Sequence, residues 1–371
     1  MAKRIALLTA LVSLVATSMA FASGGSRDYG WELTPTGSAA RLRGLSVVNE
    51  RTVWTSGSLG TVLRTTNRGR NWESVGPPGT ENLQFRDIEA FDRNHALILS
   101  IGNGTDSRIY RTTNAGRTWT LVFLNEDPQA FYDCMTFFDH KRGLALSDPV
   151  NGRFRILATD DGGRSWHVVA ADMPPALPGE FAFAASGQCI TSTGDILSGG
   201  HGDDDDDDDD DGRHGGRGDR IAWFGTGGDA VARVFRSSDG GKRWTVHATT
   251  MHSNAFAGIF ALAFRDPQNG LAVGGDLITP AASPNMMALT RDSGRNWSLV
   301  ADNPNQYRSG AHWVNDRSAI AVGPTGSDAT FDRGHTWDRF DDGSFDTVDC
   351  VKGGDCWASG EQGRVAYLTR N

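Results

Sequence analysis

Seven side chains of this sequence have the chemistry that binds or processes an anionic group. They are three arginines, one tyrosine and three carboxylates: Arg43, Arg86, Tyr132, Asp133, Glu180, Arg308 and Asp346. A guanidinium group holds a carboxylate or phosphate through paired hydrogen bonds, so three of them at one place would suit an anionic small ligand or an acidic peptide end. The tyrosine and the acids could orient a second group of the ligand. Facing arginines and aspartates can equally pair with one another, and that alternative stays open.

The chain that carries these side chains is built of repeats. The pattern Ser/Thr-x-Asp/Asn-x-Gly-x-x-Trp occurs six times, and its copies end at Trp72, Trp119, Trp166, Trp244, Trp297 and Trp337. Successive tryptophans are 47, 47, 78, 53 and 40 residues apart. The longest interval contains an Asp-rich segment at 198–220, and without those 23 residues it is 55 residues long. A period of this size is typical of one four-stranded propeller blade.

The two ends of the chain predict how many blades there are. Short β-prone pieces alternate with glycine-rich breaks throughout, which indicates an all-β fold. The end of the chain, "CWASGEQGRVAYLTRN", matches "VWTSGSLGTVLRTTN" at 53–67 but stops before its tryptophan, and "YGWELTP" at 29–35 resembles the missing piece. We therefore predict a seven-bladed β-propeller in which Tyr29–Pro35 pairs with Val365–Thr369, so that no sheet edge stays open.

The first strand of each blade lines the central channel, and its leading end faces the binding surface. The aligned leading segments are "RGLSVV", "RDIEAF", "YDCMTF", "GEFAFA", "GIFALA", "RSGAHW" and "FDTVDC". The seven side chains named above lie at or beside these ends, so we expect them to meet at one mouth of the channel. Asp148, in the nearby segment "SDP", is a lesser candidate.

The repeated pattern itself predicts a tight turn. Its third position is Asn67, Asn114, Asp161, Asp239, Asp292 or Asp332. An Asp or Asn side chain accepts hydrogen bonds from turn N–H groups, glycine supplies an unusual backbone conformation, and tryptophan packs under the hairpin. Asparagine at two positions suits an acceptor that caps a turn but not a catalytic carboxylate. We therefore interpret the six turns as structural.

The pattern resembles the Asp-box, or bacterial neuraminidase repeat. Segments outside it, including "FYDCMTFFDHKRGLALSDPVNGRFRILATDDGGRSW", "PALPGEFAFAASG" and "YRSGAHW", resemble a family of exported bacterial propellers. That family is described as similar to photosystem II stability/assembly factors, or as BNR-repeat glycosyl hydrolases. The resemblance implies a seven-bladed propeller that acts as a binding or assembly scaffold, and its functional implication rests on fold analogy.

A glycoside hydrolase of the sialidase kind is the alternative function. Its chemistry needs an arginine cluster, a tyrosine nucleophile with a glutamate partner and an acid/base aspartate. Tyr132, Glu180 and Asp133 have the right types, beside the three arginines. The chain lacks the "RIP" motif of sialidases, however, and seven blades depart from their six. We favour a scaffold without enzymatic activity.

The N-terminus predicts export. Residues 1–22 combine Lys3 and Arg4, an apolar run and a small-residue cleavage site, as a secretory signal peptide does. The propeller then occupies 23–371 in the periplasm or outside the cell, as a monomer without a transmembrane segment. We predict a disulfide between Cys350 and Cys356 across a hairpin and buried thiols at Cys134 and Cys189.

The charge of the chain is concentrated in one run. Nine consecutive aspartates, 203–211, account for the whole net charge of −9. We expect 198–220 to be a disordered insertion in blade four. No basic stripe suggests nucleic acid, and no cofactor or metal motif is present, so we expect a protein or an anionic small ligand as partner.

Overall fold

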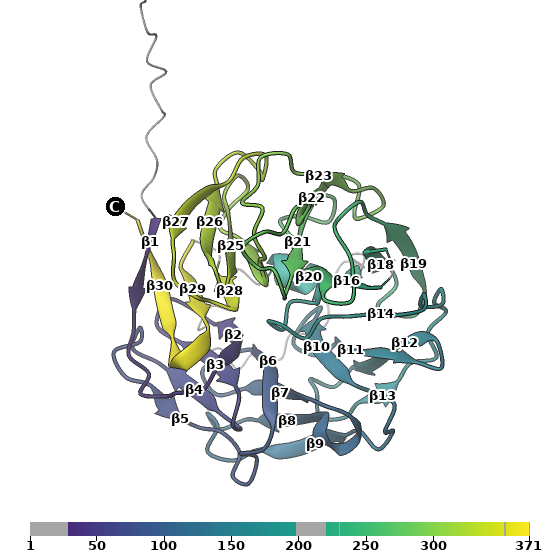
Figure 1. The fold of residues 1–371 in the computed structure, drawn as a ribbon. Coiled ribbons are helices and arrows are strands. Elements are labelled where there is room, and N and C mark those ends of the chain that lie inside the picture. Colours follow the sequence, from purple (N-terminus) through teal and green to yellow (C-terminus); the bar gives the residue numbers. More distant parts are fainter. Residues whose placement is uncertain (1–28, 198–219, 230, 352–353, 371) are drawn as a thin grey trace, which may run out of the picture.

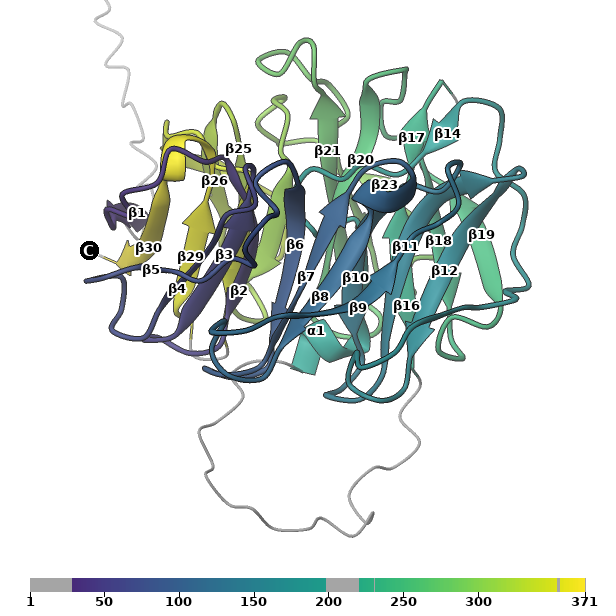
Figure 2. The same cartoon turned by 90° about the horizontal axis from the view of Figure 1, so that it is seen from below.

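The computed structural model describes residues 29–197, 220–229, 231–351 and 354–370. Seven antiparallel sheets stand around a central channel, like the blades of a propeller (Figure 1). The strands run between the two faces of the disc (Figure 2). The predicted all-β fold and the predicted number of blades are confirmed.

Blades one to three are consecutive along the chain. Blade one contains β2 (Leu42–Val47), β3 (Val53–Gly57), β4 (Val62–Thr65) and β5 (Glu73–Ser74). Blade two contains β6 (Gln84–Ala90), β7 (Ala96–Ile101), β8 (Arg108–Thr112) and β9 (Thr120–Leu124), with the short helix η1 (Gly104–Asp106) before β8. Blade three contains β10 (Tyr132–Phe137), β11 (Gly143–Val150), β12 (Arg153–Thr159) and β13 (His167–Val168).

Blades four to six follow, with one irregularity. Blade four contains β15 (Ile190–Ser192), β16 (Ala222–Gly225), β18 (Arg233–Ser237) and β19 (Trp244–Ala248), and helix α1 (Thr193–Leu197) follows β15. Blade five contains β20 (Ala257–Phe264), β21 (Gly270–Asp276), β22 (Met287–Thr290) and β23 (Ser298–Leu299), extended by β17 (Gly227–Gly228) and β14 (Glu180–Phe181). Blade six contains β24 (Gly310–Trp313), β25 (Ala319–Gly323), β26 (Gly326–Thr330) and β27 (Asp338–Asp341).

Blade seven joins the two ends of the chain. It contains β28 (Thr347–Cys350), β29 (Cys356–Ser359), β30 (Val365–Arg370) and the N-terminal β1 (Tyr29–Leu33), with η2 (Glu361–Gly363) before β30. Trp31 pairs with Leu368, and its indole N–H donates to Ser327 Oγ of blade six at 3.0 Å. The predicted closure is confirmed, and it leaves neither terminal strand unpaired.

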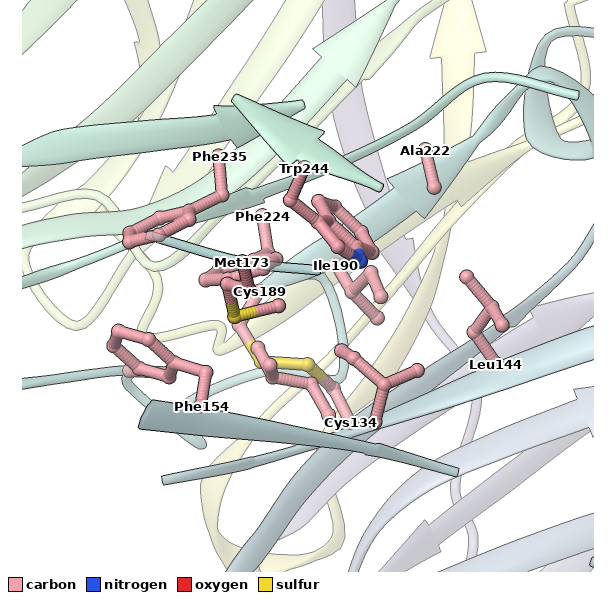
Figure 3. Packing of buried hydrophobic residues seen from close by; sticks show 13 residues of the cluster. Cys134, Leu144, Phe154, Met173, Cys189, Ile190, Ala222, Phe224, Phe235 and Trp244 are labelled. Atoms are coloured by element: carbon pink, nitrogen blue, oxygen red, sulfur yellow. A yellow bond between two sulfur atoms is a disulfide. The ribbon is translucent and has the colours of Figure 1, made fainter. Parts of the chain in front are cut away.

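The apolar core lies between neighbouring blades. The cluster in Figure 3 joins Leu144 and Phe154 of blade three to Phe224 and Phe235 of blade four, and all four side chains are buried. Similar clusters join the other blades. A strand whose two faces each pack on a neighbouring blade has apolar side chains at nearly every position. β20 is an example.

The first strand of blade four was predicted wrongly. The segment "GEFAFA" forms β14, which pairs with β17 at the edge of the sheet of blade five, and the strand that lines the channel is β15. The segment "GQCITS" at 187–192, which ends with β15, aligns with "YDCMTF" of β10, so Cys189 corresponds to Cys134 of blade three.

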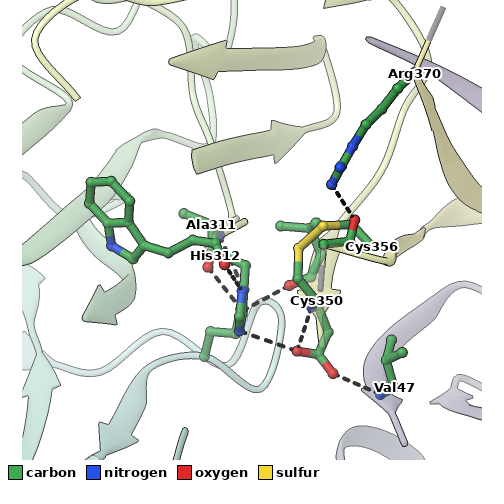
Figure 4. Close-up of a disulfide and its surroundings, with 11 residues drawn as sticks. Val47, Ala311, His312, Cys350, Cys356 and Arg370 are labelled. Atoms are coloured by element: carbon green, nitrogen blue, oxygen red, sulfur yellow. Dashed lines mark hydrogen bonds and ion pairs between the residues drawn. A yellow bond between two sulfur atoms is a disulfide. The ribbon is translucent and has the colours of Figure 1, made fainter. Parts of the chain in front are cut away.

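The prediction for Cys134 and Cys189 is wrong for the same reason. Equivalent positions on neighbouring first strands lie side by side, and the two cysteines form a disulfide with Cα atoms 6.1 Å apart (Figure 3). The predicted disulfide between Cys350 and Cys356 is present, at the turn from β28 to β29 (Figure 4).

Two hydrogen bonds occur in all six repeated turns, from the glycine N–H to the Ser/Thr hydroxyl and from the N–H before the tryptophan to the Asp/Asn side chain, and the four aspartate turns add a third. In the turn at 159–166, the Thr159 hydroxyl accepts the Gly163 N–H at 3.0 Å. The Asp161 carboxylate accepts the N–H groups of Arg164 and Ser165 at 2.9 and 3.0 Å. The capping that the pattern predicted is therefore present.

Two predicted segments lie outside the described residues. These are the signal peptide, 1–22, and all of the Asp-rich insertion except Arg220. The described residues before and after it belong to helix α1 and to β16 of blade four. Among the described helices, none is long and apolar enough to cross a membrane.

Candidate functional site

Irregular pairing at the start of four first strands aims side chains at one mouth of the channel. The register of the first two strands shifts at Arg43 in blade one, Arg86 in blade two, Asp133 in blade three and Phe260 in blade five. A bulge leaves one residue out of the ladder and redirects its side chain. The local backbone therefore brings equivalent positions of different blades to the same place.

Two arginines of blade one share one carboxylate at this mouth. Arg41 holds Asp346 of blade seven through two hydrogen bonds, at 2.7 and 2.6 Å. Arg43 Nε lies 3.8 Å from the same carboxylate, beyond hydrogen-bond distance. That Nε atom is buried and has no hydrogen-bond partner among the described residues. The Asp346 carboxylate is therefore hydrogen-bonded to Arg41 and not to Arg43.

Arg86 adds a second guanidinium that lacks a carboxylate. Its Nη1 donates to the Ala184 carbonyl at 2.6 Å, and no ion pair of Arg86 occurs among the described residues. Burial, and secondly the charge of Arg43, lower the pKa of Arg86 to about 9, so the group stays charged at neutral pH. Burial and the charge of Asp148 raise the pKa of Asp133 well above its usual range, which favours the neutral form of that acid. The mouth therefore carries excess positive charge.

Aromatic rings lie beside these charges. Phe183 stacks on Phe260 with ring centroids 3.9 Å apart, and Phe260 meets Tyr307 edge-on at 4.7 Å. Burial, and secondly the charge of Asp346, raise the pKa of Tyr307, which keeps it a neutral phenol. A buried aromatic cluster therefore lies next to the guanidinium groups of the mouth.

A segment that we call the strap, residues 182–189, crosses the channel below this mouth. Its hydrogen bonds reach Asp148 of blade three, Arg86 of blade two and Ser309 of blade six. The Gln188 side chain bonds carbonyls of blades six and seven, at 3.1 and 3.0 Å. Contacts with so many blades require the strap to span the channel.

Below the strap lies a chamber of 370 Å³. No arginine or lysine is among its described lining residues. Its wall contains five carboxyl groups: Asp87, Glu89, Asp139, Asp195 and Asp349. His312 Nε2 is 3.4 Å from Asp349 Oδ1 (Figure 4). Burial raises the pKa of Asp87, Glu89, Asp195 and Asp349, that of Asp87 to about 7.

Arg308 does not reach the mouth, although it was predicted there. Its side chain is inaccessible to solvent and forms an ion pair with Asp328 at 2.5 Å. Nη1 donates to the Tyr307 carbonyl and the Thr325 hydroxyl. The Arg308 guanidinium therefore links buried groups within blade six.

The set that a sialidase-like enzyme needs is not assembled. Tyr132 is 1 % exposed and packs on Phe123, 5.2 Å between centroids. The Glu180 carboxylate is buried against Arg233, whose Nε donates to it at 2.8 Å. A nucleophile and its partner would have to share one accessible site, and these two side chains are enclosed in different parts of the fold.

Three of the seven predicted residues therefore meet at the mouth: Arg43 and Arg86, which are half-buried, and Asp346, which is buried at 3 % exposure. Asp133 lies beside them and is likewise buried, at 1 % exposure. Sequence reasoning missed Arg41, although it stands only two residues before Arg43. It also missed Phe260 and the strap, since nothing local shows that 182–189 leaves its own blade.

The fold and the mouth define a seven-bladed propeller with a basic site at one end of a blocked channel. No protein-family model matches the chain, and a search of curated proteins finds no match. Solved structures of the same fold do match. A structure described as YCF48 bound to D1 peptide has a TM-score of 0.63 at 12% identity, over 92% of this chain and 95% of that one.

Two further structures agree in fold. YCF48 from Cyanidioschyzon merolae has a TM-score of 0.61 at 16% identity, over 91% of this chain and 98% of that one. The WD40 propeller domain of Doa1 scores 0.58 at 11% identity, over 92% and 97%. Such low identities establish a shared fold, and the function has to be argued from the site.

Proposed function

We propose that this chain is a binding or assembly protein that holds an anionic part of a protein partner at the basic mouth. One observation carries the proposal: Arg43 and Arg86 face the mouth without a carboxylate within hydrogen-bond distance among the described residues. Half-buried guanidinium groups that no carboxylate hydrogen-bonds gain most from an incoming carboxylate or phosphate.

Partly exposed apolar groups favour a peptide over a bare ion. Phe181 and Ala185 pack against the buried cluster of Phe183, Phe260 and Tyr307 and are themselves partly exposed, which suits a chain end whose carboxylate meets arginine and whose side chain meets apolar surface. The likeness in fold to YCF48 bound to D1 peptide supports a protein partner. The proposed signal peptide supports a role outside the cytoplasm, in the periplasm or beyond the cell.

The test is capture of partners from the exported fraction of the native host. We compare the wild-type chain with the double variant Arg43→Gln, Arg86→Gln. The matched control is Arg51→Gln, Arg93→Gln, which removes the same charge from exposed loops of the same two blades at the other face. The proposal predicts partners that the wild type and the control retain and the mouth variant loses. Equal retention by all three proteins would refute it.

A further inference from the structure

A second basic pocket lies at the face opposite the mouth, where the repeated turns are. It has a volume of 310 Å³ and lies between blades five and six. The charged and aromatic residues of its wall are three arginines, one histidine, one aspartate and one tryptophan: Arg265, Arg291, Arg333, His335, Asp332 and Trp313. None of these six residues contributes to the mouth.

The Arg265 side chain is held in place by neighbouring groups. Its guanidinium lies over the Trp313 ring, 5.2 Å from the centroid, and its Nη1 donates to the Asp316 carbonyl at 2.5 Å. Its Nε is buried, is 3.7 Å from Asp266, and has no hydrogen-bond partner in the described parts of the chain. The Asp266 oxygen nearest to Arg265, Oδ2, accepts a hydrogen bond from the Asn269 side-chain amide at 2.9 Å.

The other two arginines come from neighbouring repeated turns. Arg291 Nη2 is 2.9 Å from His335 Nε2, which accepts this hydrogen bond as a neutral imidazole. The Arg333 guanidinium has no hydrogen bond or ion pair to the described residues. The Asp332 carboxylate accepts from its own turn, from the N–H groups of His335 and Thr336.

Positive charge in this pocket is therefore incompletely balanced. Burial is the main cause that lowers the pKa of Arg265, and the charges of Arg333 and Arg291 lower it further, against Asp266 and Asp316. Mutual repulsion of guanidinium groups around an open volume is relieved when an anion enters.

We propose that this pocket binds the phosphate or sulfate group of a small ester, with Arg291 and Arg333 as the principal ligands. Planar guanidinium groups match the oxygens of such an anion. The volume falls within the range of small-molecule sites, which is larger than a bare ion needs. Leu289 and Trp313 in the wall supply apolar surface for the group that carries the anion.

Calorimetric titration of the full chain tests the proposal with three probes: glucose 6-phosphate, inorganic phosphate and inorganic sulfate. We expect saturable binding of at least one probe, weakened at least tenfold in Arg291→Gln and in Arg333→Gln. Tighter binding of the ester than of the free ions supports the proposed ligand, whereas equal binding overturns the ester in favour of a free anion.

Two controls distinguish this pocket from the other basic surfaces of the molecule. Arg68 occupies the same position of the turn in blade one as Arg333 in blade six, with φ of 60° and 70°, so Arg68→Gln should bind like the wild type. The variant Arg43→Gln, Arg86→Gln should also bind like the wild type. Loss of binding in that variant would move the anion to the mouth, and no saturable binding of any probe to the wild type would likewise overturn the proposal. Thermal melts confirm that each variant is folded.

Discussion

Arg308 and Arg86 have the same side chain and opposite surroundings. Arg308 is inaccessible and bonded to Asp328, whereas Arg86 lies at the mouth with a carbonyl as partner. The sequence pattern predicted that both arginines lie at the start of the first strand of a blade. It could not distinguish them, because the acid that engages Arg308 comes from a third strand, twenty residues later.

Replacing each of the two arginines by glutamine should lower the unfolding free energy by a different amount. Arg308→Gln leaves Asp328 buried without a counter-charge, which costs about 3–5 kcal/mol of unfolding free energy. Arg86→Gln removes one hydrogen bond to a carbonyl and costs about 1 kcal/mol. Urea denaturation of the two variants measures both values. Equal losses would show that the burial of Arg308 has been misjudged.

Glu89 predicts how stability depends on pH. Burial raises its pKa well above the usual range, with added repulsion from Asp195 and Asp87. A raised pKa means that the folded protein keeps a proton that the unfolded chain has lost, so this contribution is full below about pH 4 and is lost as pH rises through the folded pKa. With the pKa of Asp87 at about 7, unfolding free energy should fall between pH 5 and pH 8.

Glu89→Gln removes one of these carboxyl groups. The variant should be more stable than the wild type at pH 8, and its stability should change less between pH 5 and pH 8. Glu126→Gln, at an exposed position, is the control and should follow the wild-type curve. Chemical denaturation at four pH values measures the slopes. An unchanged slope in Glu89→Gln would contradict the assignment.

At the scale of elements, the repeated turn was the most predictable feature. Its hydroxyl, carboxylate and glycine act within eight residues, so the local sequence contains every partner. The strap was the least predictable. Its partners lie in blades two, three, five, six and seven, and only the closed ring brings them together.

Ala115 and Gly116 give a matched test of the turn. Both have a positive φ, 66° and 76°. A Cβ on Gly116 would lie 2.7 Å from Val75 Cβ, so Gly116→Ala should cost about 2–4 kcal/mol through strain and overpacking. Ala115→Gly removes the backbone strain of a positive φ but raises the conformational entropy of the unfolded chain. Its unfolding free energy should therefore stay within about 1 kcal/mol of the wild-type value. Thermal unfolding compares them, and a tolerated Gly116→Ala would contradict the packing of this turn.

For the whole molecule, the number of blades and the closure could be predicted because both follow from counting repeats. The Cys134–Cys189 link could not, since it depended on which strand begins blade four. Once β15 takes that place, the two cysteines fall at equivalent positions one repeat apart. A single misplaced strand therefore accounts for two wrong predictions, those for "GEFAFA" and for the cysteine pair.

The two disulfides should differ in their contribution to stability. Cys134–Cys189 closes a separation of 55 residues and joins two blades, whereas Cys350–Cys356 closes six residues within one hairpin. Chain-entropy arguments give about 4 kcal/mol for the longer loop and about 2 kcal/mol for the shorter. Paired Cys→Ala variants, unfolded in urea, measure the two losses. A larger loss for the hairpin pair would contradict this order.

The central claim concerns the mouth, and one retention measurement tests it most directly. Peptides from a digest of the host's exported proteins are passed over the immobilised chain before and after their carboxylates are converted to amides. Each charge-assisted hydrogen bond is worth about 1.5–3 kcal/mol, so the wild type should retain at least tenfold less of the amidated pool. The variant Arg43→Gln, Arg86→Gln should retain the two pools equally. Equal retention of both pools by the wild type would contradict the claim that this propeller recognises anionic groups at its mouth.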